Sequence, residues 1–308
     1  MPISVSGLWA RYFDHFDADA ALKNLEKWRE NADSPYYYLL RHLDAEGVPR
    51  AEHGGVVKRV WEANGESASG AGTFMHRVIE LFYNEETEAL ETAAEAAAEP
   101  AWRARKKSPF YQLLMHLSLV EKMPTEEQKR AAQTVAPPGT ADYIDMLFAE
   151  TPAPPGRSEE LAQWEAWRAS RPELIPVRTE MNVYSLELKF AGQLDGLFYD
   201  TAKKHFVIAD WKRCRAIERV GFRGRKGKPP FDTLPDTNFG HYTVQQNLYR
   251  LLLYHWYGVD VRRLVLVQLH PQIEAFQEHE VPIMTEATNK VLMERAREVG
   301  STWTPGNS

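Results

Sequence analysis

The sequence predicts an α/β protein with a helical N-terminal region. Three observations lead to this prediction. Apolar residues recur at helical spacing in the first part of the chain, several short runs after Val177 are typical of β-strands, and helical stretches separate or follow those runs. With 308 residues, 44% of them hydrophobic, the chain can bury a sizeable core in one large domain or in two smaller ones.

The N-terminal region is expected to consist of helices. Residues 8–45 are predicted to be helical, residues 51–72 are mixed with a small-residue loop at 65–72, and residues 74–83 form a further helix. Residues 85–98 and 110–122 predict two more helices, and the pattern at 125–128 is typical of a helix cap. Proline clusters at 137–138 and 151–156 mark a connection. We therefore expect a mainly helical region at 1–155 and a second region at 156–308.

The second region is expected to contain the sheet. A helix is predicted to start at 158–161, with Trp164 and Trp167 packed inward. Strands are predicted at 183–190, 192–199 and 206–211, followed by a long helix at 239–256. Residues 261–269 are β-branched and apolar, which predicts a buried strand, whereas Pro282 suits an edge strand at 276–283. Residues 285–299 contain neither proline nor glycine and predict a C-terminal helix that ends before Gly300.

Residues 192–212 contain the most informative pattern of the chain. If they form a β-hairpin with its turn in 200–204, antiparallel pairing about a centre between residues 202 and 203 places Asp195 opposite Asp210. Residues two apart on a strand share a face, so Asp210 and Lys212 point the same way. Hard divalent cations favour carboxylate oxygens, and a lysine beside the metal can orient or deprotonate a water or neutralise charge on a phosphate. This arrangement is nuclease-like.

The pattern resembles the PD-(D/E)XK nuclease superfamily, in particular its RecB-type and phage lambda exonuclease-like branch. Asp195, in the sequence Gly192-x-x-Asp195, matches the first metal-binding acid. The tripeptide Asp210-Trp211-Lys212 matches the second acid and the catalytic lysine. Ordinary hairpin charges are the alternative reading, but charges at the end of a buried run are costly unless they are paired or metal-bound.

Three further elements occur in the order expected for that branch. Gln245 and Tyr249 are four residues apart, share a helix face and match its Gln-x-x-x-Tyr motif. His76 lies in a segment similar to the early helix that supplies a metal-binding histidine, although a lone histidine is also common in a core. Glu80 shares a face with His76, where it either orients the imidazole or contacts the metal through water. Glu180 fits a recurring acidic position or is a strand-edge charge.

The resemblance implies a restriction-endonuclease-like core, a mixed twisted sheet flanked by helices, with a helical N-terminal extension that donates His76. It implies hydrolysis of DNA phosphodiester bonds that depends on Mg²⁺ or Mn²⁺. His76, Asp195 and Asp210 would hold the metal together with the Trp211 carbonyl, and Lys212 would act on the attacking water. The residues expected to support this site are Glu80, Glu180, Gln245 and Tyr249.

A basic cluster follows the predicted site. Residues 203–228 contain ten Lys and Arg residues, against Asp210 and Glu218, in a chain of net charge −6. Such a cluster is either a solvated loop or a track for the phosphate backbone, and we expect the track. Phe222 in its glycine-rich part can stack on a base. The cations expected to contact DNA are Arg213, Arg215, Arg219, Arg223, Arg225, Lys226 and Lys228.

The resemblance implies an exonuclease that acts at strand ends, in recombination, repair or replication of a viral or mobile genome. Three rivals stay open: a structure-specific or restriction-like endonuclease of the same fold, a catalytically silent nucleic-acid-binding scaffold, and a helical interaction protein with a chance motif. The sequence contains neither G-x-x-x-x-G-K-[ST] nor Cys-x-x-Cys, which argues against an ATP-driven motor, a zinc finger and a cysteine-ligated cluster.

The expected location follows from cysteine usage and hydropathy. The chain has one cysteine, Cys214, so no intrachain disulfide can form, and it shows neither a secretory signal nor an apolar run of membrane-span length. We therefore expect an intracellular protein, in the cytoplasm or in a eukaryotic nucleus, that is not secreted and has no membrane partner. The expected partners are single- or double-stranded DNA and a recombination or replication protein, with the oligomeric state left open.

Overall fold

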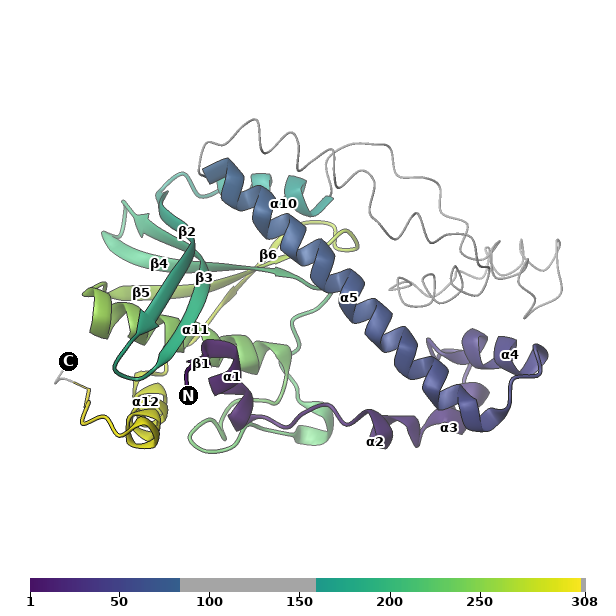
Figure 1. Ribbon diagram of the computed structural model, residues 1–308. Helices are drawn as coiled ribbons and strands as arrows, with labels where there is room; N and C mark the ends of the chain where they lie inside the picture. Colours follow the sequence, from purple (N-terminus) through teal and green to yellow (C-terminus); the bar gives the residue numbers. More distant parts are fainter. Residues whose placement is uncertain (84–158, 306–308) are drawn as a thin grey trace. The chain divides into compact units, whose positions relative to one another are not determined.

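We describe residues 1–83 and 159–305 of the computed structural model, which divides into two compact units (Figure 1). Within these ranges, the sheet unit comprises residues 1–15, 75–83 and 159–305, and the helical unit comprises residues 16–74. The expected boundary at 155/156 lies outside the described residues, as do the helices expected at 85–98 and 110–122 and the cap at 125–128. These expectations stay predictions.

The sheet unit is built on a mixed sheet of six strands. The strands are β1 (Ile3–Ser4), β2 (Leu174–Ser185), β3 (Phe190–Asp200), β4 (His205–Arg213), β5 (Val261–Leu269) and β6 (Gln277–Glu280). Their order is β1-β3-β4-β5-β6, and β2 also pairs with β3. β3 is antiparallel to β2 and β4, β4 is parallel to β5, and β5 is antiparallel to the edge strand β6. The expected mixed sheet with helices is confirmed.

Helices flank this sheet and also form the helical unit (Figure 1). The sheet unit contains α1 (Val5–Trp9), η1 (Ala10–Tyr12), α10 (Glu159–Ala169), η3 (Phe222–Gly224), α11 (Asn238–Tyr257) and α12 (Thr285–Val299). The helical unit contains α2 (Ala18–Leu22), α3 (Leu25–Glu30), α4 (Tyr37–Ala45) and most of α5 (Arg50–Tyr83), whose last turns, from Met75, belong to the sheet unit. The predicted long helix and the C-terminal helix that ends before Gly300 are confirmed by α11 and α12.

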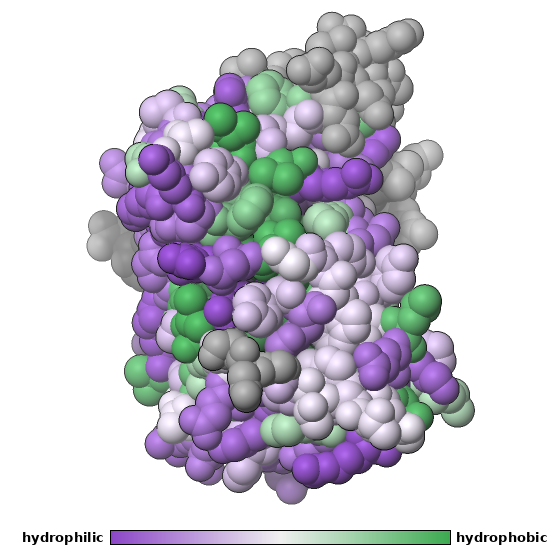
Figure 2. Space-filling view, turned by 90° about the vertical axis from the view of Figure 1, so that its left-hand side faces the viewer, coloured by the Kyte–Doolittle hydropathy of each residue, from purple (hydrophilic) through white to green (hydrophobic). Residues whose placement is uncertain are grey.

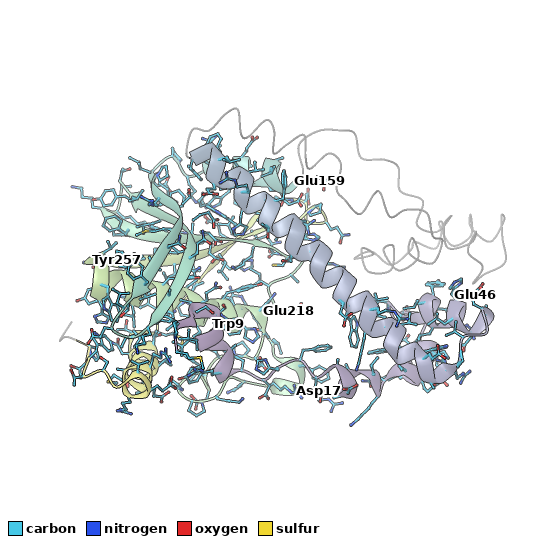
Figure 3. All side chains as sticks on the ribbon, in the orientation of Figure 1. Trp9, Asp17, Glu46, Glu159, Glu218 and Tyr257 are labelled. Atoms are coloured by element: carbon cyan, nitrogen blue, oxygen red, sulfur yellow. The ribbon has the colours of Figure 1, made fainter. Side chains whose placement is uncertain are left out.

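Alternation along β4 separates two apolar layers. Ile208 packs in a core with residues of α1, α11 and α12, whereas Val207, Ala209 and Trp211 pack in a second core with residues of α5 and α10. Trp164 and Trp167 of α10 are 2% and 1% exposed, so their predicted inward packing is confirmed. Since residues two apart on a strand share a face, Asp210 and Lys212 lie on the Ile208 side, toward α11. Figure 3 shows side chains filling both layers.

The hairpin formed by β3 and β4 has the predicted register. Gly196 pairs with Ala209 and Asp200 pairs with His205, which centres the hairpin between residues 202 and 203. The turn is local, because Asp200 Oδ1 accepts hydrogen bonds from the backbone N–H groups of Ala202 at 2.9 Å and Lys203 at 2.7 Å. An aspartate at the start of a tight turn commonly accepts such hydrogen bonds, so this turn can be predicted from the sequence.

Three expectations about elements are wrong. Residues 65–72 are not a loop but part of the continuous helix α5, because no proline interrupts residues 50–83 and each glycine costs only about 1 kcal/mol relative to alanine. Residues 8–45 are not continuously helical: Asp17 caps a new helix by accepting from Ala20 N at 2.9 Å. The strand expected at 183–190 is instead the end of β2 and a turn, where Lys189 has a left-handed φ of 49°.

The helical unit has its own small core. Leu39, Leu40 and Leu43 of α4 pack against Val57 and neighbouring valines of α5.

None of the helices in residues 1–83 and 159–305 is long and apolar enough to cross a membrane.

Strand β2 has a second edge that pairs with no strand in the described part of the chain. Several large apolar side chains on or next to β2 are exposed, namely Ile175, Val177, Tyr184 and Leu186. Figure 2, which looks from the left-hand side of Figure 1, shows apolar residues gathered in the upper half of that face with polar residues around them. The bulge between Pro176 and Arg178 interrupts the regular pairing of β2 with β3.

Candidate active site

The candidate site lies where β3 and β4 stop pairing. Their ladder ends at Gly196 and Ala209, so the next residues toward the open end are Asp195 and Asp210. Asp195 Oδ2 accepts a hydrogen bond from the backbone N–H of Trp211 at 2.9 Å. The Asp195 carboxylate therefore takes the place of a backbone acceptor and is held against the end of β4.

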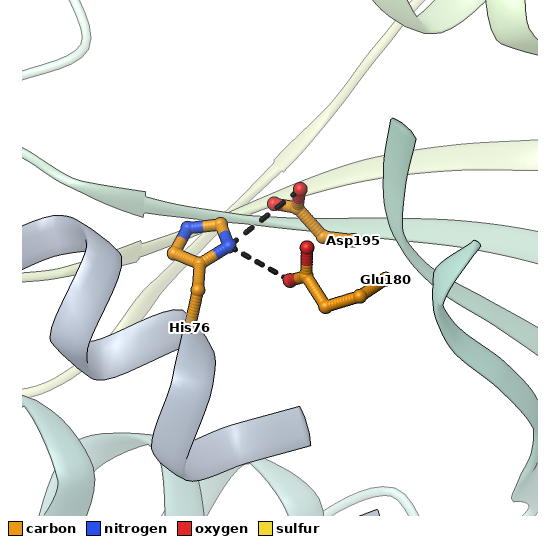
Figure 4. A group of neighbouring side chains, drawn as sticks. All are labelled: His76, Glu180 and Asp195. Atoms are coloured by element: carbon orange, nitrogen blue, oxygen red, sulfur yellow. Dashed lines mark hydrogen bonds and ion pairs between the residues drawn. The ribbon is translucent and has the colours of Figure 1, made fainter. Parts of the chain in front are cut away.

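His76 of α5 contacts both strands through its two ring nitrogens (Figure 4). Its Nδ1 lies 3.1 Å from Glu180 Oε1 and 3.7 Å from Asp195 Oδ1, and its Nε2 donates to the Trp211 carbonyl at 3.1 Å. Since a carbonyl only accepts, Nε2 carries a proton. Nδ1 therefore faces two carboxylates either with a second proton or with a lone pair. The candidate ligand atoms of His76, Glu180 and Asp195 all lie within 4.8 Å of one another.

Glu180 reaches this cluster through an unusual backbone conformation. Its φ is 46°, and the residues on either side of it, Thr179 and Met181, pair with Gly196 and Leu194. Glu180 thus interrupts β2 opposite Asp195. A left-handed non-glycine residue costs about 1–3 kcal/mol and is concentrated at functional sites, so this strain supports a role for Glu180 in the site.

Asp210 and Lys212 form a buried ion pair next to this cluster. Lys212 Nζ lies 2.6 Å from Asp210 Oδ2, and the Asp210 side chain is 1% exposed. Burial raises the pKa of Asp210, the nearby Asp195 carboxylate raises it further, and Lys212 acts against both. Burial by itself lowers the pKa of Lys212, but Asp210 and Asp195 outweigh burial and raise it, so the ammonium is charged at neutral pH.

These residues fit a divalent cation. Asp210 Oδ1 is buried and has no hydrogen-bond partner among the described residues, although buried carboxylate oxygens are normally satisfied. The carboxylates of Glu180 and Asp195 meet the His76 imidazole, and Asp210 is close enough to Asp195 for the two charges to interact. With Nδ1 deprotonated, this is the oxygen-rich donor set that Mg²⁺ and Mn²⁺ favour. A cation there would also offset the repulsion between Asp195 and Asp210.

Helix α11 places the expected Gln-x-x-x-Tyr pair beside these carboxylates. Gln245 Nε2 donates to the Tyr249 hydroxyl at 3.4 Å. Burial raises the pKa of Tyr249 to about 12, with contributions from Asp210 and Asp195 against those of Gln245 and Lys212. A Cβ at Gly192 of β3 would lie only 2.7 Å from the Tyr249 ring, so glycine is required for this close packing.

Tyr242 contacts the site, although the sequence motif assigned it no role. Lys212 Nζ lies over its ring, 4.7 Å from the centroid, which is a cation–π geometry. Tyr242 precedes Gln245 by three residues and Tyr249 by seven, so the three share one face of α11. The sequence therefore predicts that these three side chains share a face of α11. It does not predict that this face meets Lys212.

Three expected site residues have other partners. Glu80 accepts from Arg77 Nη1 at 2.7 Å, so neither ring nitrogen of His76 contacts it, and the residue beside His76 is Glu180. Arg213 is the last residue of β4 and pairs with Glu160 at 2.6 Å, rather than extending into a loop. Lys228 pairs with Asp14 at 3.1 Å, with both side chains more than half exposed. Local acids thus neutralise two of the expected DNA-binding cations.

The other five expected DNA-binding cations form no ion pair with a described residue. They are Arg215, Arg219, Arg223, Arg225 and Lys226, and all are exposed. Arg219 stacks over the Phe239 ring at 3.8 Å, and Arg223 lies over Phe222 at 5.1 Å. Their contact with DNA stays a prediction.

Metal affinity is expected to rise with pH through the titration of His76. Burial by itself lowers the pKa of His76, but Asp195 and Glu180 raise it from 6.5 to about 9. The ion pairs of the protonated ring therefore stabilise the metal-free fold fully below pH 6.5, and this contribution is lost as pH rises through 9. A metal at Nδ1 must displace that proton, so its affinity should rise by about tenfold per pH unit up to pH 9.

The measurement is the Mn²⁺ concentration for half-maximal binding at pH 7, 8 and 9, followed by calorimetry. His76→Ala should raise this concentration, flatten its pH dependence and change DNA binding less. His53→Ala is the matched control, because His53 is a buried histidine of the helical unit that contacts Arg29. An unchanged Mn²⁺ concentration and pH slope in His76→Ala would make His76 a purely structural residue.

A mixed sheet flanked by helices, with acids and a lysine at one spot, defines a protein of the metal-dependent nuclease class. Residues 31–299 match the family model described as "PD-(D/E)XK nuclease superfamily". The chain belongs to the PD-(D/E)XK nuclease superfamily, whose members act on nucleic acid and generally use divalent metals such as Mg²⁺.

A search of curated proteins found no match. Among the solved structures, 14 chains match, and one of them is described as "Crystal structure of SSO0001". It is 15% identical to this chain, covers 62% of it and 83% of its own length, and has a TM-score of 0.24.

Proposed function

We propose that this protein hydrolyses phosphodiester bonds of DNA with Mg²⁺ or Mn²⁺, and that it acts at strand ends as an exonuclease of the RecB-type and lambda exonuclease-like branch. Recombination, repair or replication is the corresponding cellular role. The observation that carries the proposal is the cluster of His76, Glu180 and Asp195, whose Asp195 charge acts on the neighbouring Asp210–Lys212 ion pair. The position of Gln245 and Tyr249 beside the carboxylates supports the branch.

Asp195, Asp210, His76 and Glu180 are the side chains that would hold the metal. The Trp211 carbonyl accepts from His76 and keeps a second lone pair, so it is a further candidate ligand. A bound divalent cation supplies positive charge and lowers the pKa of its bound water. The hydrogen bond from Trp211 N–H to Asp195 and the contact of His76 with Trp211 orient these ligands before any ion binds.

Lys212 is proposed to stabilise negative charge and to orient the attacking water. Its raised pKa keeps it protonated, which favours these roles over that of a general base. Tyr242 holds the ammonium through its ring face, and Asp210 holds it through an ion pair. The charge is thus preorganised where an attacked phosphate develops additional negative charge.

The proposed function is tested with end-labelled linear DNA and covalently closed circular DNA of the same sequence. Mg²⁺, Mn²⁺ and EDTA are compared, and a matched RNA is included. We expect metal-dependent release of nucleotides from linear DNA and no cleavage of the closed circle. Cleavage of the circle would identify an endonuclease of the same fold. Preferred cleavage of RNA would contradict the assignment of DNA as the substrate. Absence of cleavage with either metal would indicate a scaffold that binds nucleic acid without cleaving it.

A further inference from the structure

We propose that Phe222 and its neighbours form a stacking platform for an unpaired base, so that the substrate is engaged as a single strand. The platform comprises Val220, Phe222 and Arg223, in the segment between β4 and α11. This inference rests on the proposed function and deepens it, because it names the form of nucleic acid that the protein takes. Stacking on a base face requires an unpaired or frayed base, since the faces of paired bases are covered by their neighbours.

The first observation is the exposure of large apolar side chains in this segment. Phe222 is 68% exposed and Val220 is 81% exposed, whereas Phe231 and Phe239 of the same segment and the adjoining helix are buried. Arg223 already lies over the Phe222 ring, with its guanidinium carbon 5.1 Å from the centroid. An aromatic ring and a guanidinium plane are the two protein groups on which nucleic-acid bases stack.

The second observation is that the platform has a defined backbone. Gly224 N donates to Gly221 O at 2.9 Å, and Arg225 N donates to Phe222 O at 3.2 Å. Arg223 has a left-handed φ of 54°, a conformation that costs about 1–3 kcal/mol and is concentrated at functional sites. A Cβ on Gly221 would collide with the Arg225 carbonyl, so glycine is required at the base of the turn.

The base of the segment is anchored to the rest of the sheet unit. Asp236 N donates to Arg225 O at 3.0 Å, and Gly227 N donates to Leu234 O at 3.0 Å. Lys228 N donates to Tyr12 O at 2.7 Å, which ties the segment to the N-terminal helices. The exposed ring is therefore presented on a supported turn, which reduces the entropy lost when a base binds.

The third observation is charge complementarity with a phosphate chain. Arg215, Arg219, Arg225 and Lys226 flank the platform on both sides in sequence, are exposed, and form no ion pair within the described ranges. A positive track interrupted by an aromatic ring is the arrangement that binds single strands without sequence preference. A protein partner with an apolar patch would not need this excess of unpaired cations.

The experiment measures Kd values of the full-length protein in EDTA, so that no cleavage occurs. The probes are a single-stranded 15-mer and a blunt duplex of the same sequence. Phe222→Ala should raise the single-strand Kd by about 5- to 150-fold, the range for loss of one stacked base. Phe222→Trp should retain single-strand binding, and Phe222→Leu, which keeps an apolar side chain without a ring, should behave like the alanine variant.

Two controls separate stacking from charge and from folding. Leu186→Ala removes an 81% exposed apolar side chain elsewhere in the sheet unit and should leave both Kd values unchanged. Arg225→Gln with Lys226→Gln should flatten the slope of log affinity against log salt, by about 0.7 per lost phosphate contact on single strands and 0.9 on duplex. Phe222→Ala should leave that slope unchanged.

Equal losses on both probes, or none on either, would overturn the platform. Full binding by Phe222→Leu would also overturn it, because an apolar contact without a ring would then suffice. The binding test does not depend on turnover. Absence of metal-dependent cleavage in a protein that binds as expected would refute the proposed function alone, and cleavage without the Phe222 effect would refute this inference alone.

Discussion

Replacement of Lys212 by alanine is expected to reduce kcat for DNA cleavage by about 10²–10³ while the fold stays intact. The ammonium is preorganised by three groups: Asp210 at 2.6 Å, the Tyr242 ring at 4.7 Å, and the more distant charge of Asp195. Charge stabilisation of this kind acts on the transition state more than on the bound ground state. The loss should therefore appear in kcat, with little change in KM.

Lys203→Ala is the matched control for this prediction. Lys203 is an exposed lysine in the turn of the same hairpin, so its removal tests for general effects of lost positive charge. The measurement is single-turnover cleavage of end-labelled DNA at saturating Mg²⁺, with circular dichroism as the test of folding. Near-normal cleavage by Lys212→Ala, or full activity of the unaltered protein in EDTA, would contradict the assignment of this site as the active site.

Asp195→Asn is expected to weaken metal binding by about 10–100-fold or more. Loss of a residue that only hydrogen-bonds a metal ligand typically weakens metal binding by about 10–100-fold, and loss of a ligand should cost at least as much. Asp195 contacts both the end of α5 and strand β4. Its Oδ2 accepts from Trp211 N, and its Oδ1 faces His76 Nδ1. Asparagine keeps the shape and one acceptor oxygen but loses the charge, so the fold should persist while the cation loses a carboxylate ligand.

Two measurements check this expectation. The first is the Mn²⁺ concentration for half-maximal cleavage, and the second is the rise of Tm with added Mn²⁺. Ligand at 100 times its Kd stabilises a protein by about 2.7 kcal/mol, so a weakened site gives a smaller rise at the same concentration. Asp232→Asn, at an exposed position of the same unit, should change neither. If Asp195→Asn shows the same half-maximal Mn²⁺ concentration as the unaltered protein, Asp195 is not a ligand.

The hairpin register was predictable because it depends on neighbouring residues. The turn at 200–204 is closed by hydrogen bonds from backbone N–H groups to Asp200, and strand alternation then puts Asp210 and Lys212 on one face. The pair Gln245 and Tyr249 was predictable for the same reason, since helical spacing alone puts them together. β5 was readable from the continuous apolar stretch at 264–267, which is rich in leucine and valine.

The continuity of α5 was not predictable from local composition. Glycines and serines at 65–72 resemble a loop, yet each residue costs the helix little by itself. The break within residues 8–45 shows the converse: Asp17 accepts a capping hydrogen bond from Ala20 N and starts a new helix inside a stretch that has helical spacing. In both places two local signals point in opposite directions, so neither composition nor apolar spacing alone determines where a helix continues or ends.

The identity of the residue beside His76 was decided by packing over a long separation. Local spacing favoured Glu80, one helical turn away, but Arg77 takes its carboxylate, and Glu180, 104 residues from His76, occupies the place. The pairing of Arg213 with Glu160 and the stacking of Lys212 on Tyr242 have the same origin. Periodicity determines which side chains share a face, because it acts over a few residues. Which faces meet depends on how helices and strands distant in sequence pack, and no local pattern encodes that choice.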